Sequence, residues 1–285
     1  MKKTLLLTVA ILLGFVNSYA WDSMGHATIA ALAERHLSPA ARKALDKYLG
    51  GQDIILISSD PDYLRGKWTT DVGFKPDNLS DSRPEWVREF DRSLPDNYAV
   101  FPHTFTVDEN LEPYHGPNLD GKFICDAMWY IEKFAEQLTR EAETMDAQER
   151  RIAITIVIHM VGDIHCPSHV TYGAFTDQPG AFTIDGKSYK FHSFWDSILS
   201  NGAPWSCCDL AEMLDNADRK EIAGITAGNP YEWAKACAQD CYEVSHIATD
   251  AAFPKSYIVE ARQLGYSQAR KAGYRLASIL NRIFK

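Results

Sequence analysis

The sequence is poor in positive charge and in apolar runs long enough to cross a membrane. It has 29 Lys and Arg residues against 38 Asp and Glu residues, which gives a formal net charge of −9 at pH 7. A surface of that sign repels polyanions, so an anionic ligand must be held by a local group such as bound metal cations. Beyond residue 20 no run is apolar enough for a bilayer. We therefore expect no attachment to a membrane, and no pattern indicates a stable protein partner.

Residues 21–285 also lack internal repeats, low-complexity tracts and any linker rich in Pro, Gly and Ser. A chain of this length without such a division fits one domain. We predict a single domain over residues 21–285.

The first twenty residues differ from the rest of the chain. Lys2 and Lys3 precede an apolar run over residues 5–16, and small residues, Ser18 and Ala20, occupy the positions that a signal peptidase reads. This pattern predicts a signal peptide over residues 1–20, which would make the protein secreted or periplasmic and Trp21 its first mature residue. A membrane anchor is the alternative, and the run is short for it.

Six cysteines remain after residue 20. An even number in an exported chain predicts disulfide staples, although the sequence does not select among the pairings. Neighbours in sequence and residues four apart on a helix have poor geometry for pairing with each other. The residues are Cys125, Cys166, Cys207, Cys208, Cys237 and Cys241.

Helical periodicity dominates the pattern of apolar residues, so the predicted class is all-α. Ser38-Pro39 opens one helix and Gly50-Gly51 closes it. One short β-hairpin is predicted around Asp185-Gly186, and residues 66–100, rich in Pro, Asp and Asn, look like a long surface loop. Four further helices are predicted over residues 124–142, 147–165, 230–246 and 256–283.

Histidines and aspartates gather within two short segments. His159 and Asp163 are four apart, so they share one face of the central predicted helix, and His169 follows after Pro167. His192 and Asp196 form a second pair with the same spacing. One such pair is usually a satisfied polar residue in the core. Two pairs and a further histidine indicate a metal site, and imidazole with carboxylate suits zinc.

The predicted mature N-terminus offers a further donor set. Trp21 would carry a free α-amine, and His26 follows five residues later. An amine and its own carbonyl can chelate a metal in a five-membered ring. The alternative is that Trp21 is a core aromatic residue and His26 an ordinary polar residue of a first helix.

Taken in order, these motifs resemble the zinc-dependent single-strand nucleases, the fungal and plant type I nucleases, which share their site with trimetal bacterial phospholipase C. The resemblance runs from residue 21 to the C-terminal helices. Its most specific part is His-x-x-Gly-Asp-x-His-x-Pro-x-His, which residues 159–169 match at every fixed position. The other matches are Trp21 with Gly25-His26, Asp62 with Arg65, His103, and the segment from His192 to Asp196. Asp60 competes with Asp62 for the same place in the second motif.

This resemblance implies a helical domain with a cleft that holds three zinc ions. One zinc would take Asp62, His103, His159 and Asp163; another would take Trp21, His26 and the bridging Asp163; and the last would take His169, His192 and Asp196. Arg65 would bind the phosphate, and Phe105 would stack a base unless it is a core aromatic residue. The implied substrates are single-stranded DNA and RNA, cut to 5′-phosphate products by a hydroxide shared between zincs, and 3′-nucleotides.

The chain departs from the family pattern beside the expected ligands. Cys166 and Ser168 replace the usual Gln and Leu of the central motif, and Asp60-Pro61 replaces Trp-Ala. Cys166 could be half of a disulfide or an inert buried thiol, with a zinc thiolate the least favoured reading, and His165 is expected to support ligands rather than to bind metal. The alternatives to a nuclease are a zinc-dependent phospholipase C and a catalytically weak zinc-binding relative.

Overall fold

Helices hold most of the residues that the computed structural model describes, which are residues 21–65, 103–114, 126–173, 179–202 and 204–285. The predicted signal peptide, the whole predicted surface loop over residues 66–100 and Cys125 lie outside this part. The helices in chain order are α1 (Ser23–Arg35), α2 (Pro39–Tyr48), α3 (Ile54–Ile57), η1 (Asp60–Arg65), α6 (Ala127–Glu141), α7 (Ala147–Asp163), η3 (Pro167–His169), α8 (Phe191–Asp196), α9 (Cys207–Leu214), α10 (Arg219–Ile225), α11 (Pro230–Ser245) and α12 (Tyr257–Ile283).

Local capping explains where several helices begin and end. The Ser38 side chain accepts a hydrogen bond from the backbone N–H of Ala41, and Pro39 occupies the first turn of α2, where its missing N–H costs nothing. Gly50 and Gly51 follow with φ of 64° and 79°, a region that glycine adopts without a steric penalty. The sequence prediction for this helix is therefore confirmed, and the four longer helices also form at their expected places.

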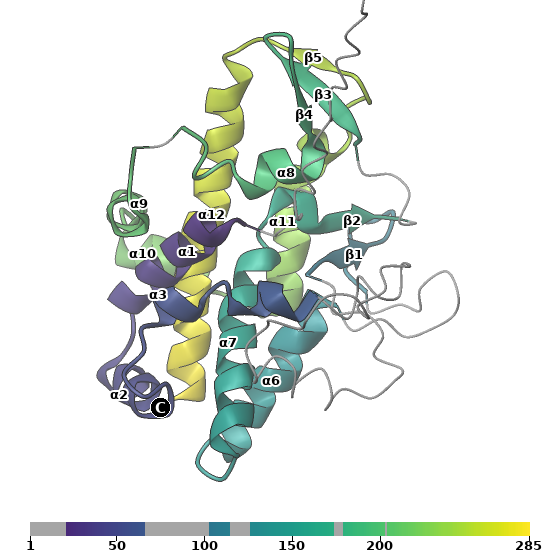
Figure 1. Cartoon of the computed structure of the whole chain (residues 1–285). Coiled ribbons are helices and arrows are strands. Elements are labelled where there is room, and N and C mark those ends of the chain that lie inside the picture. The colour runs from purple at the N-terminus through teal and green to yellow at the C-terminus, as the bar shows by residue number, and fades with distance from the viewer. Residues whose placement is uncertain (1–20, 66–102, 115–125, 174–178, 203) are drawn as a thin grey trace, which may run out of the picture.

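The core is built around α7 and α12. Residues from Ile152 to Asp163 on α7 are all buried, which agrees with its lack of a polar face, and α7 packs along α6. The last helix, α12, runs the length of the molecule from β5 (Ala252–Phe253) to α2 (Figure 1). It crosses α1 closely, because a Cβ atom on Gly273 would lie 2.6 Å from Cδ2 of Leu32. These contacts place α1 and α7 side by side at the centre.

Short strands correct the prediction of an all-α fold with one hairpin. The hairpin itself is confirmed: β3 (Ala181–Ile184) pairs antiparallel with β4 (Lys187–Lys190), and Asp185 and Gly186 turn with positive φ. However, β5 adds to β3 in parallel, and β1 (Phe105–Val107) pairs in parallel with β2 (Val170–Tyr172). Strands of two or three residues are too short to show a period-two pattern, which is why the sequence did not reveal them.

The cysteines of the described residues are all thiols in this structure. The nearest sulfur atoms belong to Cys237 and Cys241, 3.8 Å apart, and to Cys207 and Cys208, 4.0 Å apart. A disulfide has an S–S length of about 2.05 Å, so the predicted staples are not confirmed. Among the described helices, none combines the length and the apolar character needed to cross a bilayer.

Candidate metal centre

The central helix places His159 and Asp163 together. They are one turn apart on α7, both fully buried, with Nε2 of His159 3.2 Å from Oδ2 of Asp163. Nδ1 of His159 lies 2.7 Å from the carbonyl oxygen of Ser58, which fixes the proton on that nitrogen. The lone pair of Nε2 therefore faces the carboxylate, and such a contact becomes favourable only when a proton or a metal cation lies between the two atoms.

Helix α1 brings His26 against this pair. Its ring stacks on that of His159 with centroids 3.8 Å apart, and its Nε2 lies 3.3 Å from Oδ1 of Asp163. The approach depends on Gly162, because a Cβ atom there would lie 2.9 Å from Nδ1 of His26. In the central motif, Gly162 thus allows His26 to pack against α7, and Asp163 is the candidate ligand.

Trp21 is anchored beside the same helix. Its side chain is fully buried, and Nε1 donates a hydrogen bond of 3.0 Å to the carbonyl oxygen of Gly162. Gly25 allows the indole to fold back over α1, since a Cβ atom on it would lie 2.8 Å from Cβ of Trp21. The backbone N–H of Asp22 donates to the carbonyl oxygen of Asp196, 2.9 Å away. Trp21 is therefore a core aromatic residue that is bonded to Gly162, the residue before Asp163.

Asp62 and His103 complete a second group of side chains. Nδ1 of His103 lies 2.8 Å from Oδ2 of Asp163 and 2.9 Å from Nε2 of His159. Oδ1 of Asp62 is 3.7 Å from that nitrogen of His159 and 3.8 Å from that of His103. Asp60, the competing residue, faces away toward Arg151, with Oδ2 3.3 Å from Nη2. The geometry thus joins Asp62, and not Asp60, to the histidines.

The short parallel pair of strands holds His103 and His169 at one edge. His103 precedes β1, His169 directly precedes β2, and Phe105 is paired with Val170. Nδ1–H of His169 donates to the carbonyl oxygen of His103. His169 is thereby oriented by the backbone next to the first two groups.

A third group lies around His169 and Asp196. Helix α8 carries Asp196, whose Oδ2 is 3.6 Å from Nε2 of His192, and the rings of His169 and His192 have centroids 5.1 Å apart. Ser168 donates from Oγ to Oδ1 of Asp196 over 2.8 Å. The side chain of His192 is 27 % exposed, whereas His169 and Asp196 are buried. His192 therefore marks the side of the site that faces solvent.

Mutual charge interactions perturb the pKa values of the buried groups. Burial raises the pKa of Asp163, but His159 and His103 outweigh it and hold this pKa well below the usual range. Burial lowers the pKa of His159, yet the carboxylates of Asp163 and Asp62 leave it raised. The pKa of His26 is lowered by burial and by His159. The site therefore favours the ionised form of Asp163, and protonation of His159 disfavours protonation of His26 beside it.

These donors fit divalent cations of the zinc type. Three buried atoms have no hydrogen-bond partner of good geometry among the described residues. They are the two carboxylate oxygens of Asp163 and Nε2 of His26. Such atoms are costly unless a cation satisfies them. Ligand atoms lie within 4.8 Å of one another in three groups: His26, His159 and Asp163; Asp62, His103 and His159; and Cys166, His169 and Asp196. Nitrogen and oxygen donors in compact buried sets suit zinc.

Three other residues that the sequence singled out are not among these donors. Arg65 ends η1, but its side chain lies outside the described part of the chain. Phe105 is 1 % exposed, which favours the core alternative over the stacking of a base. His165 bonds to the carbonyl oxygen of Val161 and to Arg275, neither of which is a candidate ligand, so its expected role beside the ligands stays a prediction.

Some contributors to the site could not be placed there from the sequence. The roles of Ser58, Ser168 and Cys166 become apparent only in three dimensions. For Ser168 and Cys166 a signal was present, because both stand inside the central motif where they depart from its usual residues. For Ser58 the sequence offers none, since a backbone carbonyl is the contacting group.

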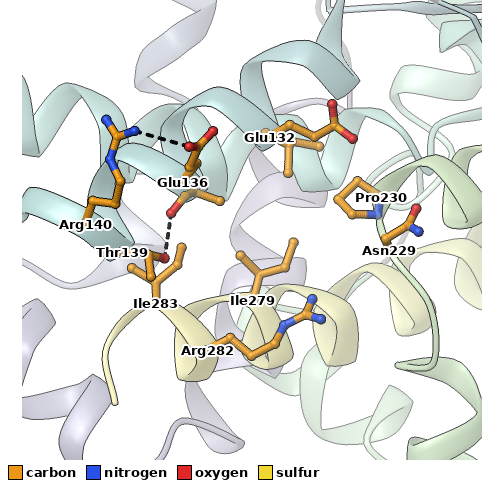
Figure 2. Close-up of a pocket in the computed structure, with 11 residues that line it drawn as sticks. Glu132, Glu136, Thr139, Arg140, Asn229, Pro230, Ile279, Arg282 and Ile283 are labelled. Carbon is orange, nitrogen blue, oxygen red and sulfur yellow. Dashed lines mark hydrogen bonds and ion pairs between the residues drawn. The ribbon is translucent and has the colours of Figure 1, made fainter.

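A separate pocket of about 440 Å³ lies between α6, α12 and the start of α11 (Figure 2). Ile131, Ala135, Ile279 and Ile283 form its apolar walls, and charged side chains such as Glu136 and Arg140 stand at its edge. None of the candidate metal ligands lines it. The pocket is therefore no part of the metal centre.

Comparisons with known proteins identify relatives of this chain. The family model described as S1/P1 Nuclease matches residues 21–285. Endonuclease 2 from Arabidopsis thaliana is 24 % identical over 98 % of this chain and 96 % of its own length. Nuclease P1 from Penicillium citrinum is 22 % identical over 92 % of this chain and 97 % of its own length, and Nuclease PA3 from Penicillium sp. matches over the same extent.

Proposed function

Because this chain belongs to the S1/P1 nuclease family, we propose that it is a zinc-dependent endonuclease that hydrolyses phosphodiester bonds of single-stranded DNA and RNA. The products would carry 5′-phosphate, and 3′-nucleotides would be dephosphorylated at the same site. Family membership makes the chain a phosphodiester hydrolase that acts on nucleic acids; the strand preference, the products and the nucleotidase activity are part of the proposal.

One observation carries the proposal: Asp163 joins two donor groups. Its Oδ1 faces His26, and its Oδ2 faces His103 and His159. A carboxylate with each oxygen directed at a different set of donors is suited to bridge two cations. We therefore assign Asp62, His103, His159 and Asp163 to one zinc, Trp21, His26 and Asp163 to a second, and His169, His192 and Asp196 to a third.

Bound zinc ions would supply Lewis acidity and would lower the pKa of a water molecule toward about 7. The chain's own residues supply position and charge. Ser58 orients His159 through its carbonyl oxygen, and the backbone of His103 orients His169. We assign Arg65 to the phosphate oxygens, where a planar guanidinium makes paired hydrogen bonds. With His192 as the exposed member of the site, the substrate would enter from that side.

Local charge is the reason that an acidic protein can bind nucleic acid here. The chain carries a net charge of −9, which opposes a phosphodiester at long range. Three divalent cations against the carboxylates of Asp62, Asp163 and Asp196 leave a positive site. Export by way of residues 1–20 completes the proposal: removal of this segment would free the α-amine of Trp21 as a ligand in a secreted or periplasmic protein.

The experiment that tests this function compares substrates and metal content on the processed protein. Purified protein beginning at Trp21 is incubated with single-stranded DNA, RNA, 3′-AMP and phosphatidylcholine, with and without a chelator, and metals are counted by mass spectrometry. Cleavage of nucleic acid that the chelator abolishes, with about three zincs per chain, is the expected result. Hydrolysis of the lipid alone would identify a phospholipase C, and zinc without hydrolysis a binding protein.

A matched pair of variants tests the bridging residue. Asp163→Asn removes the charge from the centre and should lower activity and zinc content together. Asp185→Asn makes the same change in the exposed hairpin turn, where asparagine tolerates the positive φ of 50°. Equal activity of the two variants would remove Asp163 from the site.

A further inference from the structure

Cys166 stands beside the third group of donors, where the family pattern has no sulfur. It directly precedes η3, and its backbone oxygen accepts from the backbone N–H of His169 over 2.9 Å. In a 3₁₀ turn the side chains of residues three apart lie on the same side. Cys166 and His169 are three apart and fully buried, so the turn directs sulfur and imidazole into one place.

Helix α8 adds Asp196 to this pair. One ligand atom from each of the three residues lies within 4.8 Å of the others, and Sγ of Cys166 is 4.0 Å from Oδ1 of Asp196. In a tetrahedral zinc site with the usual bond lengths, sulfur and oxygen ligands are about 3.6 Å apart. The observed separation is within a few tenths of an ångström of that value.

We propose that Cys166 is a sulfur ligand of the metal that His169, His192 and Asp196 hold, which makes this site softer than the two around Asp163. The inference rests on the proposed function, because it assumes that the third site binds a metal. On binding, the thiol proton passes to solvent and the sulfur donates a lone pair, without any change of oxidation state. Thiolate and carboxylate together balance the charge of a divalent cation.

A softer donor set changes which metals the site retains. Sulfur ligands favour thiophilic cations, whereas imidazole and carboxylate alone are less selective. Cadmium should therefore be retained at the third site in preference to the other two. The competing role for Cys166 is a hydrogen bond only: its sulfur is 3.1 Å from Oγ of Ser168, which in turn donates to Asp196.

Cobalt substitution separates these two roles. Protein loaded with Co²⁺ is examined in the near ultraviolet for sulfur-to-cobalt charge transfer, while mass spectrometry counts the bound metals. The half-buried thiol of Cys207 and the exposed thiol of Cys208 are first replaced by serine, because they could bind cobalt themselves. We expect a charge-transfer band that Cys166→Ser abolishes and that Cys241→Ala, a change at an equally buried thiol on α11, retains.

NMR of the cadmium-substituted protein gives an independent reading for each site. One resonance of three should lie far downfield of the others, as sulfur coordination requires, and it should move upfield or vanish in Cys166→Ser. A fully loaded protein without the band or the downfield resonance overturns the sulfur ligand and leaves the proposed function intact. A protein that binds no third metal overturns both. If Cys166→Ser fails to fold, the spectra of the protein with Cys166 intact decide whether sulfur binds the metal.

Discussion

The indole nitrogen of Trp21 donates a hydrogen bond to the carbonyl oxygen of Gly162, the residue before Asp163, over 3.0 Å. This bond joins the start of the predicted mature chain to the centre of the fold. The contact of the Asp22 backbone N–H with the carbonyl oxygen of Asp196 fixes the same segment to α8. The beginning of residues 21–285 is thus part of the wall of the site.

Extension of the chain before Trp21 should therefore impair the metal centre without unfolding it. A protein that keeps one extra alanine before Trp21 has no α-amine at this place. We expect bound zinc to fall from about three to about two per chain, with the melting curve still cooperative. Metal analysis of both forms checks this, and a full complement of zinc in the extended form would contradict the assignment of the amine.

Gly162→Ala should weaken metal binding through His26. The new methyl carbon would lie 2.9 Å from Nδ1 of that imidazole, in a packed environment where the ring has to move. We expect zinc affinity to fall by about 10-fold to 100-fold, as for other changes that disturb the orientation of ligands. Competition with a chromogenic chelator measures the affinity.

The matched control is Gly224→Ala on α10. Nothing lies within 4 Å of a Cβ atom at this exposed helical position, so alanine should raise stability by up to about 1 kcal/mol. Equal loss of zinc in both variants would show that the effect is not due to contact with His26.

Removal of metal should lower thermal stability. Asp163 and its neighbouring histidines are buried, so without cations their mutual contacts become costly. With free zinc at about 100 times its dissociation constant, a single bound ion contributes about 2.7 kcal/mol to the folded state. For a domain of this size we expect the melting temperature to fall by about 5–10 °C in excess chelator. Calorimetry with and without chelator checks this, and an unchanged transition would contradict it.

Stability should also depend on the ionisation of Asp215, away from the centre. Burial raises its pKa, but hydrogen bonds from Arg35, His36 and Tyr274 outweigh this and leave it below the usual 3.8. A lowered pKa means that the charged form stabilises the fold above the unfolded value, and that this contribution is lost as the pH falls through the folded value.

Asp215→Asn tests this pH dependence. The variant should unfold about 1–2 kcal/mol more easily at pH 7, and the difference should shrink below pH 4. Urea unfolding of the metal-free proteins at several pH values is the measurement, with Asp185→Asn as the exposed control. A difference that is the same at pH 3 and pH 7 would contradict the role of the charge.

Sequence patterns sufficed where local chemistry decides the structure. Ser38-Pro39, Asp185-Gly186 and the apolar length of α7 each act over a few residues, so their consequences could be predicted. The spacing of His159 and Asp163 likewise fixes a shared helix face. In the second motif the sequence left Asp60 as a competitor of Asp62, because a short 3₁₀ turn has no apolar repeat to set its register.

Other features depend on contacts between distant segments. The pairing of Phe105 with Val170, and the burial of Phe105 that follows, cannot be inferred from strands of three residues. The nearness of Cys166 to Asp196 needs α8 to pack on η3. Such relations are set by tertiary packing, and no local pattern encodes them.

The parallel pairing of β1 with β2 sets the positions of two imidazoles, His103 and His169, whatever the sequence of the turns between them. Main-chain pairing of β1 with β2 joins the segment that carries His103 to the one that carries His169, and the His169 side chain adds a hydrogen bond to the carbonyl oxygen of His103. Evolution can therefore lengthen or replace the outer turns of the intervening polypeptide while the inner frame stays constant. An engineer who seeks altered selectivity has the same freedom there.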